Sequence, residues 1–217
     1  MNKYTIGLLA LVLITILSIS SCKKDKEEVI IPQFDGISAG VWDDSFYHET
    51  FSDPIIVKAI YDSTKLIGYG AKDIGIQTAN GIANLTVNIK RFNPDSANNH
   101  PDNIFNYVHI VFPETFDIIT ISETFLVPKA SIDVYSVAAL NKNNPIKHES
   151  KWHSLINKSH NLALWEEPAQ DVEKVGEWHG INSIAYIGFR ENDKPGWLKV
   201  DMTSRYYPRI LEYAIKK

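Results

Sequence analysis

Residues 85–90 read Leu-Thr-Val-Asn-Ile-Lys, so every second residue in this stretch is apolar. Successive side chains of a β-strand point to opposite faces, which would place Leu85, Val87 and Ile89 on a buried face and the polar residues between them on a solvent-exposed face. A strand with one apolar face must pack that face against another layer of the protein. The stretch therefore predicts a half-buried strand in a layered β structure.

Similar short runs, rich in β-branched and aromatic residues, recur from about Phe34 onward and are separated by Gly, Pro, Asn and Asp. Helical spacing is confined to the surroundings of Trp152, so the strand–helix–strand alternation of parallel sheets is missing. We therefore predict an all-β fold, an antiparallel and jelly-roll-like β-sandwich. Strands are expected at residues 55–61, 85–90, 104–112, 116–122, 131–137, 162–165, 183–190, 197–202 and 210–215.

The N-terminus has the composition of a secretory leader. Lys3 precedes a mostly apolar stretch, residues 6–19, which is shorter than the ~18 to 20 residues that a membrane-spanning helix needs. Residues 23–28 are all charged and are expected to stay solvated as a tether. The predicted boundaries are 1–21 for a signal peptide, 22–33 for the tether and 34–217 for a single β-sandwich domain.

Ile19-Ser20-Ser21-Cys22 resembles the lipobox of bacterial lipoproteins. The resemblance implies cleavage before Cys22 and acylation of this cysteine, for example by palmitate. The charged tether resembles that of Bacteroidota-type outer-membrane lipoproteins, which implies a protein anchored by its lipid to the cell outer membrane. Because Cys22 is the only cysteine, the domain has no disulfide and must be stabilised by packing.

Three C-terminal blocks, residues 186–190, 196–200 and 211–214, resemble the last strands of a group of uncharacterised secreted bacterial β-sandwich proteins. The group has no established activity, so this resemblance implies a fold and not a mechanism. The first two blocks are separated by the polar residues 191–194 and predict a hairpin, in which Gly196 is available for a positive φ.

Composition argues against a nucleic-acid partner. The chain has 22 Lys and Arg against 26 Asp and Glu, a formal charge of −4 at pH 7. Nucleic-acid binding needs an excess of positive charge, because the release of counterions from phosphates supplies much of the affinity.

Metal sites are not expected either. His148 and His153 are spaced five apart, which would place them on different faces of a helix, whereas the zinc motif H-E-x-x-H spaces its histidines four apart. We expect a polar loop or a short helix there. Residues 93–103 are rich in side-chain oxygens, including those of Asp95 and Asp102, but lack the alternating order of a calcium loop. We expect no cofactor other than the lipid on Cys22.

Two parts of the sequence resemble catalytic patterns. Gly36-Ile37-Ser38-Ala39-Gly40 matches the G-x-S-x-G nucleophile elbow, but too few residues precede it to build the required sheet, so we expect a flexible loop leading into the first strand. A pair of acids for glycoside hydrolysis could be drawn from four carboxylates. These are Asp43, Asp44, Glu166 and Glu167.

Aromatic residues suggest binding. Trp165 and Trp178 each lie next to an acid, Glu166 and Glu177, and a flat ring beside a hydrogen-bonding group can hold a sugar. The favoured function is a non-catalytic envelope lipoprotein whose β-sandwich binds a glycan, a peptide or another envelope protein. The alternatives are an extracellular glycan hydrolase that uses a carboxylate pair, and a structural assembly protein with an exposed apolar patch.

Overall fold

The computed structural model describes residues 36–62, 67–92, 105–127, 130–154, 162–168, 177–204 and 207–217, and Gln33–Lys217 form one compact unit. Regular structure in the described residues consists of β-strands and one 3-10 turn, η2 (Glu177–Gly180). Among these residues, no helix is long and apolar enough to cross a membrane. The strands are β1 (Ile37–Ser38), β2 (Phe46–Ile56), β3 (Ile60–Asp62), β4 (Ile67–Thr78), β5 (Gly81–Phe92), β6 (Phe105–Val111), β7 (Phe116–Val127), β8 (Ala130–Val137), β9 (Pro145–Ile146), β10 (Trp152–Ser154), β11 (Leu162–Pro168), β12 (Ile184–Glu191), β13 (Lys194–Asp201) and β14 (Arg209–Lys216).

Hydrogen bonds link most of these strands in one path, β2-β14-β13-β12-β7-β8-β11-β6-β5-β4-β3, with β10 also beside β7. The path changes sheets within β7, because residues 116–119 pair with β12 and β10 while residues 120–127 pair with β8. We name the part from β2 to residue 119 sheet 1 and the part from residue 120 to β3 sheet 2. β1 and β9 form a short ladder of their own, without backbone pairing to either sheet.

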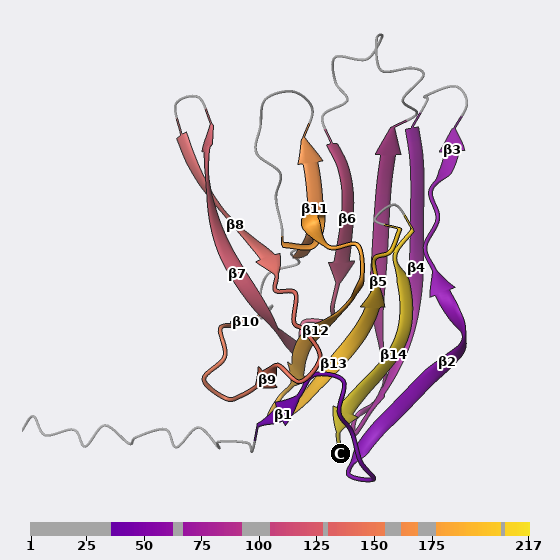
Figure 1. Ribbon diagram of the computed structural model, residues 1–217, viewed down its shortest axis with the longest axis vertical. Coiled ribbons are helices and arrows are strands. Elements are labelled where there is room, and N and C mark those ends of the chain that lie inside the picture. Colours follow the sequence, from indigo (N-terminus) through magenta and orange to yellow (C-terminus); the bar gives the residue numbers. More distant parts are fainter. Residues whose placement is uncertain are drawn as a thin grey trace, which may run out of the picture. The chain divides into compact units, whose positions relative to one another are not determined.

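The two sheets pack face to face around one hydrophobic core. Apolar side chains of β4, β5 and β6 pack against those of β12, β13 and β14. The backbone amide of Gln77 in β4 also donates a hydrogen bond to the Tyr213 hydroxyl of β14 at 2.9 Å. Figure 1 shows β12, β13 and β14, in orange to yellow, crossing in front of β4 and β5. The predicted all-β antiparallel sandwich is confirmed, with a single parallel residue pair between β8 and β11.

Strand β5 has the alternation that the sequence predicts. Leu85, Val87 and Ile89 are buried in the core, at 1%, 0% and 1% exposure. The predicted hairpin also forms, as β12 and β13. Its left-handed residue is Asn192, with φ of 54°, and not Gly196. Gly196 lies within β13 instead, where an added Cβ would come within 2.6 Å of the Phe189 ring.

Three segments differ from the sequence-based expectation. Strand β2 starts at Phe46 rather than near residue 55 and ends before residue 57, and β4 was not expected at all. Trp152 and His153 lie in strand β10, which pairs with β7, so neither a helix nor a loop forms at these two residues. Each of these segments lies beside a long strand, β14, β5 or β7, which supplies a ladder of backbone hydrogen bonds. In β4 and β10 this pairing outweighs a local sequence with weak strand propensity.

Candidate functional site

The predicted binding residues of η2 have structural contacts. The Trp178 ring is fully buried, and its Nε1 donates a hydrogen bond to the Val137 carbonyl oxygen at 3.0 Å. The Glu177 carboxylate accepts a hydrogen bond from the Ala139 amide at 2.8 Å. Because no part of the Trp178 ring reaches solvent, a stacking role for a ligand is not available to this residue.

The other predicted residues are only partly described. Trp165 and Glu166 lie in β11, opposite Val108 and Tyr107 of β6, and only their backbone is described. Cys22, Asp95 and Asp102 lie outside the described residues. The predictions of a lipid on Cys22 and of no calcium at Asp95 and Asp102 therefore stay predictions.

Two of the four carboxylates that could form a hydrolytic pair lie in the turn before β2, and the other two lie in β11. Asp43 and Asp44 are exposed in the turn that precedes β2, at one edge of sheet 1, where Asp43 accepts a hydrogen bond from the Ser45 amide at 2.8 Å. Glu166 and Glu167 lie in β11, which is an interior strand of sheet 2. The strand order thus places several strands between the two groups.

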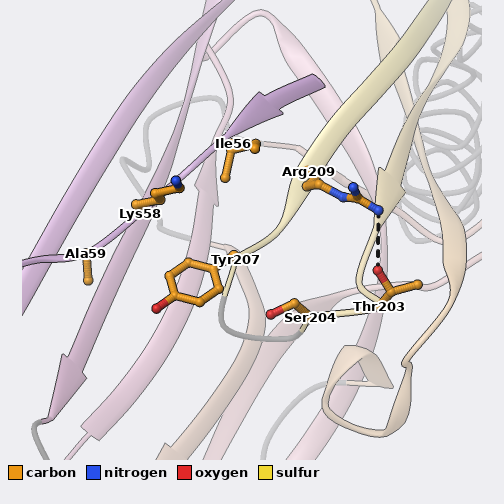
Figure 2. Close-up of a pocket in the computed structure, with 7 residues that line it drawn as sticks. All are labelled: Ile56, Lys58, Ala59, Thr203, Ser204, Tyr207 and Arg209. Carbon is orange, nitrogen blue, oxygen red and sulfur yellow. Dashed lines mark hydrogen bonds between the residues drawn. The ribbon is translucent and has the colours of Figure 1, made fainter. Parts of the chain in front are cut away.

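A pocket of about 590 Å³ opens at the end of sheet 1, where β2 ends and β14 begins. Figure 2 shows Lys58 and Ala59, which follow β2, on one side of the pocket and Thr203, Ser204 and Tyr207, which lie between β13 and β14, on the other. The lining combines two cations, two hydroxyl side chains, a tyrosine and two apolar side chains. These are Lys58, Arg209, Thr203, Ser204, Tyr207, Ile56 and Ala59.

Residues 36–44 form a strap on the outer face of sheet 1, the face turned away from sheet 2. The Ala39 amide donates a hydrogen bond to the Asn144 carbonyl oxygen at 2.9 Å, and Trp197 Nε1 donates one to the Val41 carbonyl oxygen at 3.1 Å. Gly40 has a positive φ of 72°, and an added Cβ there would lie 2.7 Å from the Tyr186 ring. The G-x-S-x-G stretch is therefore a packed strap, which corrects the expected flexible loop.

Beside the strap, four strands bring polar side chains into one row of the outer face. Thr50 of β2 pairs with Glu212 of β14, which pairs with Lys199 of β13, which pairs with Tyr186 of β12. His48 lies two residues before Thr50 and so points to the same face. The register, set by the long β2–β14 and β13–β14 ladders, thus assembles a site from four separate segments.

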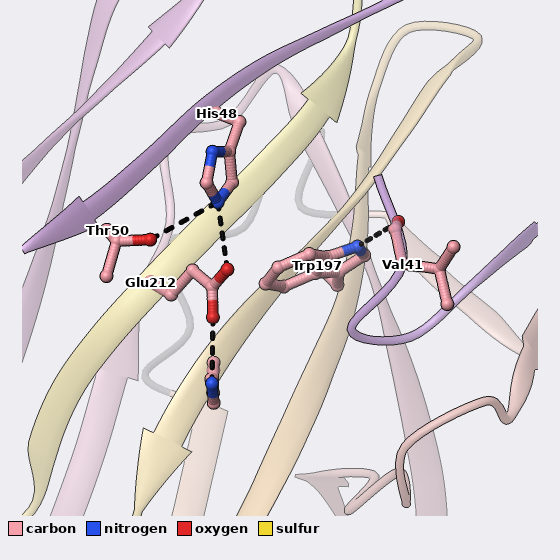
Figure 3. Close-up of polar contacts among 6 residues, drawn as sticks. Val41, His48, Thr50, Trp197 and Glu212 are labelled. Atoms are coloured by element: carbon pink, nitrogen blue, oxygen red, sulfur yellow. Dashed lines mark hydrogen bonds and ion pairs between the residues drawn. The ribbon is translucent and has the colours of Figure 1, made fainter. Parts of the chain in front are cut away.

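Glu212 is the centre of this row. One carboxylate oxygen lies 2.8 Å from His48 Nε2 and the other accepts a hydrogen bond from Lys199 Nζ at 2.8 Å. Figure 3 shows the His48 ring pointing toward Glu212, with the Thr50 hydroxyl 3.4 Å from the same nitrogen. The side chains of His48 and Glu212 are only 15% and 13% exposed, so the network is largely shielded from water.

These contacts set the protonation states of Glu212 and Lys199. Burial alone would raise the pKa of Glu212, but the hydrogen bonds and positive charges of Lys199 and His48 outweigh it and hold the pKa below its ordinary value. The hydrogen bond to Glu212 likewise raises the pKa of Lys199. Both groups therefore stay charged through the neutral pH range.

Trp42 of the strap lies flat on His48. The two ring centroids are 3.7 Å apart and the ring planes differ by 14°. The tryptophan is 47% exposed, whereas Trp178 and Trp197 are fully buried. Trp42 thus offers an exposed aromatic surface. Its ring stacks on His48, which contacts Glu212, and Glu212 in turn accepts a hydrogen bond from Lys199.

Comparison with known proteins gave no relative: no family model, no curated protein and no solved structure matches this chain. Among the described residues, no group of three or more His, Cys, Asp or Glu side chains is arranged to hold a metal ion.

Sequence reasoning missed the centre of this site. His48 and Glu212 are separated by 164 residues, and nothing in the sequence around either residue indicates the other. Trp42 carried one signal, since it is a large aromatic followed by two acids, Asp43 and Asp44, as Trp165 is followed by Glu166 and Glu167. The stacking of Trp42 on His48 and its exposure appear only in the folded structure.

Proposed function

We propose that this chain is a lipid-anchored protein of the cell envelope that binds a glycan without cleaving it. The observation that carries the proposal is the Trp42 ring, which is half exposed and stacked on His48. An aromatic ring stacks on the apolar face of a sugar, and a ring already held in place loses little side-chain entropy when the ligand binds. Glu212 and Lys199 also favour this proposal, because they hold the His48 ring on which Trp42 stacks.

The state of the nearby carboxylates favours binding over hydrolysis. A glycosidase acid must keep its proton near neutral pH, which requires a raised pKa. The pKa of Glu212 is lowered chiefly by its hydrogen bonds to Lys199 and His48, and the pKa of Asp43 is lowered by hydrogen bonds from the Ser45 hydroxyl and amide. The exposed Asp43, ionised and next to Trp42 in the chain, instead suits the acceptance of hydrogen bonds from sugar hydroxyls.

Replacing Trp42 by alanine is expected to weaken glycan binding by about tenfold or more, which corresponds to about 1.4 kcal/mol of lost stacking and burial. A glycan array identifies the sugar, and calorimetric titration then compares the dissociation constants. Tyr69→Ala is the matched control, because Tyr69 is 50% exposed but lies on β4 of sheet 2. An array without a bound glycan, or equal affinity of the Trp42 variant and the native chain, would contradict the proposal.

The anchor is proposed from the lipobox that ends at Cys22. Cells grown with labelled palmitate are expected to label the native chain, and Cys22→Ala is expected to abolish the label because the chain has one cysteine. Intact-mass measurement should show the native chain starting at residue 22 with its acyl groups, which together hold a protein stably on the membrane. An unmodified native chain that still contains residues 1–21 would disprove the anchor.

A further inference from the structure

We propose that the pocket between residues 56–59 and the β13–β14 turn is a separate binding site, and that it takes a sugar that carries a carboxylate. This site is distinct from the Trp42 surface and does not depend on the function proposed for it. Four features of the pocket support the inference: its unbalanced charge, its oriented arginine, its fixed backbone and its mixture of aromatic and hydroxyl side chains.

The charges that line the pocket do not cancel. Arg209 forms an ion pair with Asp201, whose side chain is only 6% exposed. Lys58 is exposed, and it has no hydrogen-bond or ion-pair partner among the described residues. Lys58 therefore leaves one positive charge that an anionic ligand would neutralise.

Arg209 is held in a fixed orientation. Asp201 pairs with its guanidinium and also accepts a hydrogen bond from the Thr203 amide at 2.8 Å, so one carboxylate positions both the arginine and the turn. Burial opposes ionisation of Asp201, but the hydrogen bonds from Thr203 and Arg209 prevail and lower its pKa. Figure 2 shows Arg209 directed toward Thr203, whose hydroxyl is 3.4 Å from the guanidinium.

The backbone that carries Lys58 is also fixed. Val57 is buried, and its amide donates a hydrogen bond to the Pro208 carbonyl oxygen at 3.3 Å, which ties the two walls of the pocket together. On the other side the Lys58 carbonyl lies so close to Gly70 of β4 that a Cβ there would come within 2.1 Å of it. The position of the Lys58 Cα is thus set before a ligand binds, which favours affinity.

The remaining lining matches a sugar ring. Tyr207 and Ile56 are 40% and 42% exposed and offer apolar surface, while Thr203 and Ser204 offer hydroxyl groups. The volume of about 590 Å³ falls within the range of small-molecule sites. A bare inorganic anion would leave the apolar surface uncovered, and a fatty acid would leave the hydroxyl groups without partners. A carboxylated sugar satisfies both.

The test compares methyl glucuronide with methyl glucoside, which have the same ring but differ in the carboxylate, by calorimetric titration of the full chain in detergent. The glucuronide is expected to bind about tenfold more tightly, and the preference should shrink as salt is added. Lys58→Gln should remove the preference, whereas Lys72→Gln should retain it because Lys72 is an exposed lysine of β4.

Three results would overturn the site: equal or absent binding of the two sugars, an unchanged preference in Lys58→Gln, or acetate binding as tightly as the glucuronide. The last result would indicate a simple anion site. Trp42→Ala separates this inference from the proposed function, since it should weaken binding of the array glycan by about tenfold or more and leave the glucuronide preference intact.

Discussion

Replacing Trp178 by alanine should lower the free energy of unfolding by about 3–5 kcal/mol, the usual range for a large aromatic removed from a core. The ring is fully buried in the cluster that joins the two sheets, and Nε1 donates a hydrogen bond to Val137. The substitution leaves a cavity and also leaves that carbonyl without its partner. Urea unfolding followed by circular dichroism measures the change, provided that the transition is two-state.

Two further variants make this result specific. Trp178→Phe retains much of the ring volume but loses the hydrogen bond, so it should be less destabilising than the alanine variant. Trp42→Ala removes a half-exposed ring and should be the mildest of the three. If Trp178→Ala unfolded at the same urea concentration as the native chain, the core position of η2 would be wrong.

Replacing Glu212 by alanine should lower the free energy of unfolding by about 1.5–3 kcal/mol, the range for hydrogen bonds between charged groups. The variant leaves Lys199 and His48, which are 26% and 15% exposed, without their shared carboxylate. Glu149→Ala is the control, because its ion pair with Lys147 is 3.6 Å long and mostly exposed, and its loss should change stability by less than about 0.5 kcal/mol.

The same variant should change the dependence of stability on pH. The pKa of Glu212 is lower in the folded chain than in the unfolded one, so its contribution is complete above the unfolded pKa of about 4.3 and is lost as the pH falls through the folded value. Native chain and Glu212→Ala should therefore differ most near neutral pH and converge in acid. A constant difference from pH 7 down to about pH 2 would disprove the role of the charged network.

The fold was predictable where the local pattern agrees with the tertiary context. Leu85, Val87 and Ile89 alternate regularly, and the β12–β13 hairpin joins two apolar runs through a short polar turn, so both were expected from the sequence. Strand β4 was missed because Gly68, Gly70 and Gly75 read as turn residues. In the structure Gly70 lies within a strand and permits a close approach of the Lys58 carbonyl.

The candidate site was less predictable than the fold for a physical reason. A sheet brings residues together through register, and register depends on the partner strand as much as on the strand itself. Thr50, Glu212, Lys199 and Tyr186 form one row only because β2, β14, β13 and β12 pair in that order. Trp42 stacks on His48 because the strap holds it there, and the sequence had suggested that this segment would be a flexible loop.

The pairing of β2 with β14 has a consequence for how the chain acquires its structure. A ribosome makes β2 long before β14, since partners such as His48 and Glu212 are 164 residues apart. Until β14 has been made, β2 lacks its neighbour in sheet 1, and contacts of such long sequence separation form slowly. Sheet 1 therefore cannot be completed before β14 has left the ribosome, and the unpaired edge of β2 is open to aggregation until then.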